Sequence, residues 1–215
     1  NVIQGFLNLN FTSQYLINTL KNINPLEVSK PNNELKIIEF CSPNTNKPLH
    51  LGHIRNILLG DSVSKILDYS GYDIHKTQII NDRGIHICKS MIAWMKFSNN
   101  GGPTKNETKG DHYVGEYYVK FNQEYEKQID ELIKNGKDKK YAEENAQILK
   151  DAQSLLRKWE EKDDQVIKIW KKMNSWVMKG FNETLEKLGV VFDSEYFESE
   201  TYLIGKKIIE KGLKN

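Results

Sequence analysis

The chain of 215 residues has little of what would cross-link it or anchor it in a membrane. Its two cysteines, Cys41 and Cys88, lie far apart and form no CxxC pair, which excludes a disulfide scaffold and a zinc ribbon. No apolar run approaches the roughly 18–20 residues needed to cross a bilayer, so a membrane protein is excluded as well. A reducing, cytoplasmic location is the expectation that follows.

An excess of charge of one sign is also missing. The 31 lysines and arginines are balanced by 29 aspartates and glutamates, which leaves a formal net charge of +2. This balance excludes a uniformly basic nucleic-acid binder, so any polyanion must be held at a local site. With 38% hydrophobic and 28% charged residues, the composition is that of a globular protein with a sizeable core.

The beginning of the chain has neither the basic n-region nor the apolar h-region of a signal peptide. The first residue is Asn1 rather than methionine, and we therefore expect a piece of a longer protein. Within residues 1–33, an apolar stretch (2–9) and an amphipathic segment (15–23) precede a proline-flanked linker (29–33).

A strand, a loop, a helix and a second strand are predicted between residues 36 and 80. Residues 36–41 form a short apolar run of strand length, and residues 73–80 form another that is rich in isoleucine and threonine. Between them, apolar residues recur at helical spacing from Leu51 to Tyr69, and Gly71 stands where a helix is expected to end. Such a βαβ unit implies a parallel sheet.

The rest of the chain is mostly helical in pattern. We expect a helix over residues 85–97 and two to three long helices between residues 113 and 188. A short strand is predicted at residues 189–192 and a terminal helix at residues 203–213. The predicted α/β unit is thus interrupted by a helical block.

The segment richest in chemistry runs from Ser42 to His53. It leaves the carboxyl end of a strand and enters a helix N-terminus, where open α/β sheets bind ligands and free N–H groups bind anions. His50 and His53 lie three apart on one helical face, so both imidazoles can donate to phosphate oxygens that gain charge in a transition state. Lys47 adds a mobile ammonium group, and Gly52 lets a ligand approach the backbone. The loop predicts a nucleoside-triphosphate site.

The histidine pair could also have a simpler role than phosphate binding. His50 and His53 could ligate a metal ion, but no third ligand lies nearby at the spacing of a zinc site. They could equally be unrelated surface residues. The preceding strand, the following helix and the adjacent lysine favour the nucleotide site over both of these roles.

The block from Glu39 to Asn56 resembles the signature region of class I arginyl-tRNA synthetases. Within it, His50-Leu51-Gly52-His53 resembles the HIGH motif of that class, and the lead-in Ser-Pro-Asn-x-x-Lys-Pro is the feature that separates the arginine enzymes from their relatives. Residues 81–84, Asn-Asp-Arg-Gly, resemble the Gly-Asp-Trp-Gly turn of the family but differ from it at the first and third positions. Residues 5–9 resemble the end of its N-terminal tRNA-contacting domain.

The resemblance implies an α/β fold with a Rossmann-type parallel nucleotide-binding sheet and a largely helical insertion. Residues 1–33 would be the tail of the N-terminal domain and a linker, and residues 34–84 the first half of the catalytic domain. The insertion would span residues 85–188. Residues 189–215 would return to the catalytic domain and stop before the second lysine motif and the anticodon-binding domain.

The activity implied is that of an arginine–tRNA ligase: ATP-dependent arginyl-adenylate formation, followed by transfer of arginine to tRNA(Arg). Mg²⁺ would enter with ATP and have no dedicated protein site. A monomer is expected, and the isolated piece would have little or no activity. Two alternatives are a smaller nucleotidyltransferase with the same His-x-Gly-His loop, and a truncated, non-catalytic tRNA-binding relative.

Carried over residue by residue, the resemblance assigns ATP binding to Lys47, His50, Gly52 and His53. Of these, His50 and His53 would stabilise the transition state as the carboxylate of arginine attacks the α-phosphorus, and Lys47 would neutralise the phosphates. The three together form the expected catalytic set.

A separate group of residues would bind arginine. Ser42 and Asn44 would hold its α-amino and carboxylate ends. Its guanidinium group needs a carboxylate partner, for which Glu198 matches the acidic position of the family and Glu39 is a second candidate. For any one glutamate, a solvated surface position is the more common case.

Two features of the helical region invite a functional interpretation that we do not adopt. Lys172-Met173-Asn174-Ser175 resembles the second motif of the class, Lys-Met-Ser-Lys, but it lies inside a periodic helix and is interpreted as ordinary helix surface and core. The tryptophans are interpreted as core anchors rather than base-stacking platforms. They are Trp94, Trp159, Trp170 and Trp176.

Overall fold

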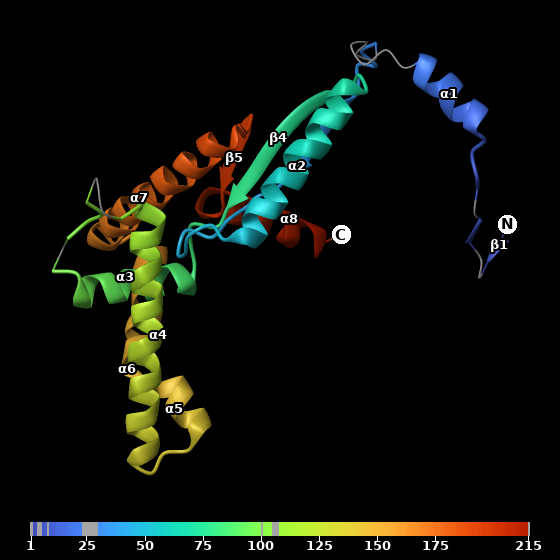
Figure 1. The fold of residues 1–215 in the computed structure, drawn as a ribbon. Helices are drawn as coiled ribbons and strands as arrows, with labels where there is room; N and C mark the ends of the chain where they lie inside the picture. The colour runs from blue at the N-terminus through green and yellow to red at the C-terminus, as the bar shows by residue number, and fades with distance from the viewer. Residues whose placement is uncertain are drawn as a thin grey trace.

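A small parallel sheet joined to a bundle of helices makes up most of the computed structural model (Figure 1). The residues that the structure describes are 2–3, 6–7, 9–22, 30–99, 101–104 and 108–214. The sheet has the order β3–β4–β5, with strands β3 (Leu35–Glu39), β4 (Asp73–Ile80) and β5 (Ser194–Phe197). All three run parallel, which confirms the α/β fold class with a parallel sheet.

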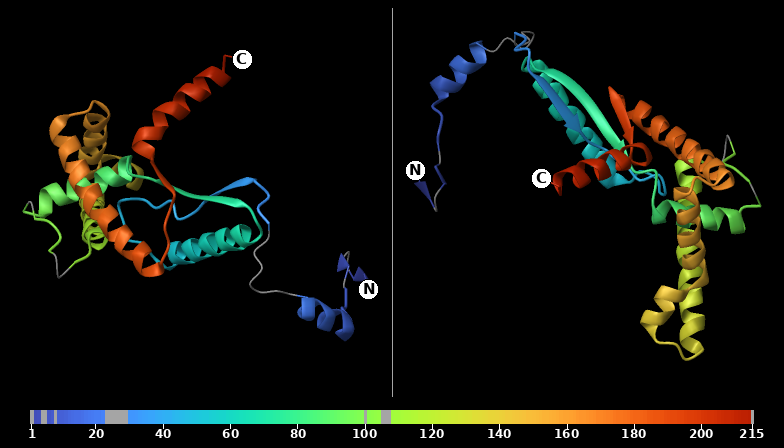
Figure 2. Two further views of the ribbon diagram at one scale, coloured as in Figure 1. Left: turned by 90° about the horizontal axis from the view of Figure 1, so that it is seen from above. Right: turned by 180° about the vertical axis from the view of Figure 1, so that it is seen from behind.

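The N-terminal segment lies apart from the sheet in the ribbon views (Figures 1 and 2). Strands β1 (Val2–Ile3) and β2 (Phe6–Leu7) pair antiparallel, and helix α1 (Ser13–Asn22) follows. Gly5 and Asn8 of the matched N-terminal stretch lie outside the described residues, as do residues 23–29, of which only the last belongs to the expected linker.

The predicted βαβ unit is confirmed. Helix α2 (Leu51–Tyr69) connects β3 to β4, and the bounds of α2 and β4 coincide with the sequence prediction. The register pairs Leu35 with Asp73 at one end and Glu39 with Thr77 at the other. The first strand ends two residues earlier than predicted, because the backbone turns sharply after Phe40.

Five helices form the helical block. They are α3 (Ile85–Phe97), α4 (Gly110–Lys134), α5 (Lys139–Asn145), α6 (Gln147–Glu160) and α7 (Asp164–Leu188). Helix α3 coincides with its prediction. The region expected to hold two to three long helices holds three, α4, α6 and α7, which confirms the prediction. The short helix α5 is additional, because the chain leaves the helical conformation at Ala146, where ψ is 128°.

The main hydrophobic core lies inside this block, between α3, α4, α6 and α7. Trp94 and Trp159 are buried in it, while Trp170 and Trp176 are partly buried against it, which confirms the interpretation as core anchors. Residues 172–175 lie within α7, so they form helix surface and core as predicted.

The return to the sheet is where the sequence prediction is wrong. Residues 189–192 do not form a strand: Gly189 ends α7 in the left-handed conformation, and Val190 is buried beneath the sheet. The ladder with β4 begins only at Asp193, whose N–H donates to the carbonyl of Lys76. The apolar residues at 189–192 that predicted a strand are there for packing against the core and not for strand pairing. The terminal helix α8 (Glu198–Gly212) also begins five residues earlier than predicted.

The sheet is covered on one face by α2 and the end of α7, through a second core cluster that includes Phe40, Ile57 and Leu185. On the opposite face Ile37 and Leu35 are 66% and 61% exposed. Among the described residues, no helix is both long and apolar enough to cross a membrane.

Candidate active site

The loop that leaves β3 makes a strained turn at the carboxyl edge of the sheet. Cys41 and Ser42 both have positive φ values, of 69° and 42°, which non-glycine residues rarely adopt. The turn is held by the amide side chain of Asn56 in α2, whose Oδ1 accepts from the Cys41 N–H at 2.6 Å. Strain that surrounding contacts enforce in this way is typical of functional loops.

After the turn, the loop runs beside the end of β4. Asn44 and Asn81 form an isolated parallel bridge, in which the Thr45 N–H donates to the Asn81 carbonyl at 3.0 Å and the Asn81 N–H donates to the Pro43 carbonyl at the same distance. The segment expected to hold the amino acid is therefore fixed to the central strand of the sheet.

Glu39 and Ser42 form a hydrogen-bonded pair at the end of β3. The Ser42 hydroxyl donates to Oε1 of Glu39 at 2.6 Å and accepts from the Ile79 N–H at 3.1 Å. Glu39 lies on the exposed face of the sheet. The pair leaves the second carboxylate oxygen of Glu39 as an acceptor for a cationic group.

His50 and His53 cap the N-terminus of α2 reciprocally. Nδ1 of His50 accepts from the Gly52 N–H at 3.0 Å, and Nδ1 of His53 accepts from the backbone N–H of His50 at 3.2 Å. Such a capping box usually pairs a serine or threonine with a glutamate. Here two imidazoles, with ring centroids 4.1 Å apart, satisfy the same orphan donors.

The caps fix the tautomer of both rings. Because Nδ1 is the acceptor in each hydrogen bond, a neutral ring must carry its proton on Nε2. Both side chains therefore present an Nε2–H donor away from the helix. The N-terminus of α2 adds its free N–H groups and dipole, so the arrangement is suited to an anion such as a phosphate.

The electrostatic surroundings keep His53 neutral. Burial, the nearby His50 and the ammonium group of Lys47 all lower the pKa of His53 below its ordinary value. A neutral imidazole retains Nδ1 as an acceptor for the cap and Nε2–H as a donor. Lys47 itself is half-buried.

Gly52 has a local reason to lack a side chain. A Cβ at this position would lie 2.9 Å from Cε1 of His50, which is closer than such contacts normally come. The absent side chain thus leaves space for the capping imidazole of His50. From the sequence, the lack of a side chain at Gly52 was expected to let a ligand approach the backbone; the space for the His50 ring is a second reason for glycine here.

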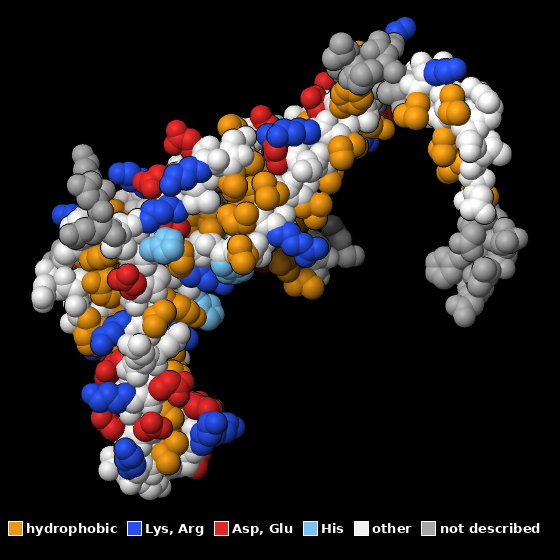
Figure 3. All heavy atoms as spheres, viewed as in Figure 1, with side chains coloured by type: hydrophobic (Ala, Val, Ile, Leu, Met, Phe, Trp, Pro, Cys, Tyr) orange, Lys and Arg blue, Asp and Glu red, His pale blue; other side chains and the backbone are white. Residues whose placement is uncertain are grey.

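Further basic groups from α3 face the same loop. The pKa of His86 is lowered by burial and by the positive charges of Lys89 and Lys47, and burial lowers the pKa of Lys89. The ring of His86 is held by the hydroxyl of Tyr118, 2.9 Å from Nδ1. In Figure 3, histidine and Lys or Arg side chains gather where the start of α2 meets α3 and α4.

Sequence reasoning missed these α3 groups. The spacing of His86 and Lys89, three apart and just beyond the residue 81–84 turn, is the signal that could have found them, because this spacing places both on one helical face.

Asp82 joins three parts of the fold behind the loop. Its buried carboxylate accepts from the N–H and the hydroxyl of Ser199, at 2.8 and 2.6 Å, in the first turn of α8. Its backbone carbonyl accepts from the indole N–H of Trp170 in α7 at 2.6 Å. The turn after β4 therefore positions the start of α8, and with it Glu198.

Glu198 stands at the carboxyl end of β5, and its carboxylate already faces a guanidinium group. Oε1 of Glu198 lies 3.7 Å from Nη1 of Arg83, whose Nη2 lies 3.3 Å from Oε1 of Glu160 in α6. The Arg83 guanidinium also lies 3.9 Å from the ring centroid of Tyr202. The two candidates for the guanidinium site thus differ: Glu39 is paired with a hydroxyl and Glu198 with a cation.

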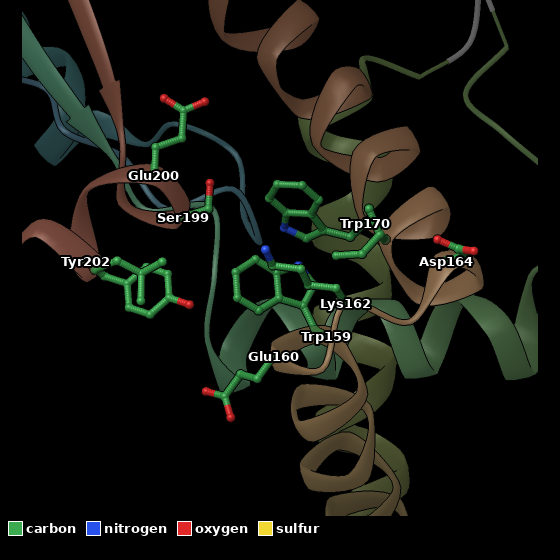
Figure 4. A pocket seen from close by; sticks show the side chains of 10 residues that line it. Trp159, Glu160, Lys162, Asp164, Trp170, Ser199, Glu200 and Tyr202 are labelled. Carbon is green, nitrogen blue, oxygen red and sulfur yellow. The ribbon is translucent and has the colours of Figure 1, made fainter.

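A cavity of about 390 Å³ opens beside this cluster (Figure 4). Trp159 and Glu160 from the end of α6, Trp170 from α7 and Tyr202 from α8 face the same space. Of the cluster around Arg83, Glu160 and Tyr202 line the cavity, whereas Arg83, Glu198 and the histidine loop do not. Within the described ranges, no group of three or more His, Cys, Asp or Glu side chains could hold a metal ion, so His50 and His53 gain no third ligand there.

The fold and the loop define a class I tRNA synthetase catalytic domain. The chain belongs to this family, described as "tRNA synthetases class I (R), catalytic domain", whose model matches residues 15–211.

Curated relatives at high identity carry the name arginine–tRNA ligase. The protein of Flavobacterium psychrophilum is 49% identical over 99% of this chain and 36% of its own length. That of Porphyromonas gingivalis is 45% identical over 99% of this chain and 36% of its own length. The chain therefore spans little more than a third of these relatives.

Solved structures share the fold at lower identity. The arginyl-tRNA synthetase of Thermus thermophilus superposes with a TM-score of 0.63 at 22% identity, over 99% of this chain and 31% of that one. The arginyl-tRNA synthetase of Plasmodium falciparum gives a TM-score of 0.58 at 17% identity, over 96% and 34%.

Proposed function

We propose that this chain provides the amino-acid-activating site of an arginine–tRNA ligase. In the proposed reaction, a carboxylate oxygen of L-arginine attacks the α-phosphorus of ATP and pyrophosphate leaves, which gives arginyl-adenylate. A hydroxyl of the terminal ribose of tRNA(Arg) then attacks the arginyl carbonyl carbon, and AMP leaves. The observation that carries the proposal is the reciprocal cap of His50 and His53, which aims two Nε2–H donors outward from a helix N-terminus. The identity of the curated relatives supports it.

His50, His53, Lys47 and Gly52 form the proposed ATP site. The two Nε2–H groups donate to phosphate oxygens and gain strength as charge builds up in the transition state, while Lys47 neutralises charge as the pyrophosphate departs. Gly52 keeps the space for the His50 ring. Mg²⁺ would accompany ATP and supply further charge neutralisation at the phosphates.

The proposed arginine site lies at the ends of the three strands. A guanidinium group needs an anionic partner, and the contact between Glu198 and Arg83 is an instance of this pairing within the chain. Glu39 and Ser42 offer acceptors that suit the α-ammonium group, with Glu39 as the alternative guanidinium partner. The amide of Asn44 completes the site at the carboxylate end.

We also propose the domain division and setting expected from the sequence. Residues 34–84 and 189–215 belong to the nucleotide-binding domain, residues 85–188 are its helical insertion, and residues 1–33 lead in from a tRNA-contacting domain. A monomer in the cytoplasm is the proposed working form. The cytoplasm is supported by Cys41 and Cys88, which are both free and buried.

The test is exchange of labelled pyrophosphate into ATP by the full-length protein, with each amino acid in turn and tRNA present. We expect exchange with arginine and none with lysine, citrulline or glutamine. Exchange with a different amino acid, or none with arginine, would refute the proposal.

The assignment of Glu198 is tested by Glu198→Gln. The amide keeps the size of the side chain but removes its charge, so we expect the KM for arginine to rise at least tenfold, which is the scale of a lost charged hydrogen bond, while the KM for ATP stays within about twofold. Glu195→Gln, in β5 three residues before Glu198, is the matched control. Equal effects on both substrates would move the guanidinium site elsewhere, with Glu39→Gln as the next variant to measure.

A further inference from the structure

The surroundings of Glu198 contain one cation shared by two carboxylates. The guanidinium group of Arg83 lies between Glu160, at 3.3 Å, and Glu198, at 3.7 Å. Its side chain is only 17% exposed, while those of Glu160 and Glu198 are 49% and 39% exposed. The three groups carry a formal charge of −1, which matches one further monocation.

Arg83 is anchored without Glu198. Its guanidinium stacks on Tyr202 at 3.9 Å and lies 5.5 Å from the ring of Trp159, both within the range of cation–π attraction. The shorter of its two ion pairs is with Glu160. Loss of the Glu198 contact would therefore leave Arg83 with a carboxylate and an aromatic partner.

The contact with Glu198 is the weak one. At 3.7 Å it is far longer than the 2.7–2.9 Å typical of a charge-assisted hydrogen bond. Only Oε1 of Glu198 takes part, so Oε2 remains for another donor. A second guanidinium that approached this carboxylate would meet the like charge of Arg83 at close range.

We propose that Arg83 is an internal competitor of the arginine substrate for the Glu198 carboxylate, and that Glu160 sets the strength of this competition by holding Arg83 back. The proposal rests on the proposed function and adds to it a residue that determines the affinity for arginine. Arg83 does not touch the substrate: it acts through Glu198. Binding of arginine transfers Glu198 from the internal guanidinium to that of the substrate.

Two substitutions in the full-length protein should act in opposite directions. Arg83→Met keeps nonpolar packing against Tyr202 but removes the charge, so the KM for arginine should fall about three- to tenfold, which is the scale of a screened unit charge at close range. Glu160→Gln removes the partner that restrains Arg83, so the same KM should rise by a similar factor. Arg83→Lys retains the charge, so its KM for arginine should stay within about twofold of that of the unsubstituted protein.

The readout is arginine-dependent pyrophosphate exchange, with the KM for ATP and the melting temperature measured for each variant. A purely structural role of Arg83 would change kcat, the KM for ATP and the melting temperature together, and would not give opposite signs for the two variants. If Arg83→Met fails to fold, Glu160→Gln is sufficient as a test, because Glu160 is partly exposed and its substitution should not prevent folding. An unchanged or lowered KM for arginine in Glu160→Gln overturns the proposal.

The two proposals fail in different ways. Absence of arginine-dependent exchange in the parent protein would refute the proposed function. Normal exchange in the parent, with a KM for arginine that does not respond to Arg83→Met or Glu160→Gln, would refute only the competition by Arg83.

Discussion

At the scale of single residues, two imidazoles do the work that a hydroxyl and a carboxylate do in most capping boxes. A serine at position 50 and a glutamate at position 53 would cap α2 equally well but would place no outward N–H donor beside the loop. The cap and the proposed phosphate contacts therefore use the two nitrogens of the same rings. The hydrogen bonds that cap α2 thus also fix the orientation of both rings.

The cap also makes stability depend on pH. The pKa of His53 is lowered in the folded protein, so over the interval between that value and about 6.5 the unfolded chain binds a proton that the folded chain does not. The contribution of His53 to the free energy of unfolding is fully present above about pH 6.5. It is lost as the pH falls through the lowered pKa, because a protonated Nδ1 can no longer accept the hydrogen bond of the cap.

We expect His53→Gln to weaken this dependence. Glutamine at the third helical position can accept from the N-cap N–H but does not titrate. Urea unfolding of both proteins between pH 5 and 7.5 should give a smaller fall in the free energy of unfolding for the variant. A residual slope of the same sign comes from His86, whose pKa is also lowered. Identical slopes in the two proteins would contradict the titration assigned to His53.

At the scale of elements, the helical block depends on close contact between α4 and α7. A Cβ at Gly180 in α7 would collide with the buried carboxylate and backbone nitrogen of Asp111 in α4, and one at Gly110 would collide with the backbone of Trp176. The helices therefore cross where each has a glycine. Lys109 completes the junction, with Nζ 3.3 Å from Asp111 and 2.6 Å from the hydroxyl of Thr184.

Gly180→Ala should separate these helices and lower the free energy of unfolding by about 1–3 kcal/mol, which is typical of an overpacked interior. Gly205→Ala in α8 is the matched control: among the described residues, no atom beyond its chain neighbours and its own helix backbone lies within 4 Å of the added Cβ. The better helix propensity of alanine should therefore leave stability unchanged or raise it by about 0.5–1 kcal/mol. Thermal unfolding of both variants tests this. A Gly180→Ala protein as stable as the parent would show that the crossing is not tightly packed.

The same scale shows why some elements could be predicted and others not. α2, β4 and α3 have clear periodicity and end at turn residues, and their bounds coincide with the sequence prediction. β5 was placed too early because Val190 and Phe192 look like strand residues but pack under the sheet. The break between α5 and α6 at Ala146 has no sequence signal, since alanine favours a helix.

At the scale of the whole molecule, the carboxyl edge of the sheet brings together residues that are far apart in the chain. A parallel sheet places strand ends side by side, so the sequence could predict that the histidine loop and Glu198 lie at one edge. It could not predict that Arg83 faces Glu198 or that Asp82 holds the start of α8, because both contacts depend on how the helical block returns the chain to the sheet.

The central claim is that the two capping imidazoles act on ATP, and pyrophosphate exchange by His53→Ala in the full-length protein tests it most directly. Removal of one preorganised donor should lower the arginine-dependent exchange rate about 10²–10³-fold. His53→Gln, which keeps the cap, serves as the control for folding of α2. The account predicts a large loss of exchange by His53→Ala in a protein that still unfolds cooperatively, and an unchanged exchange rate would contradict it.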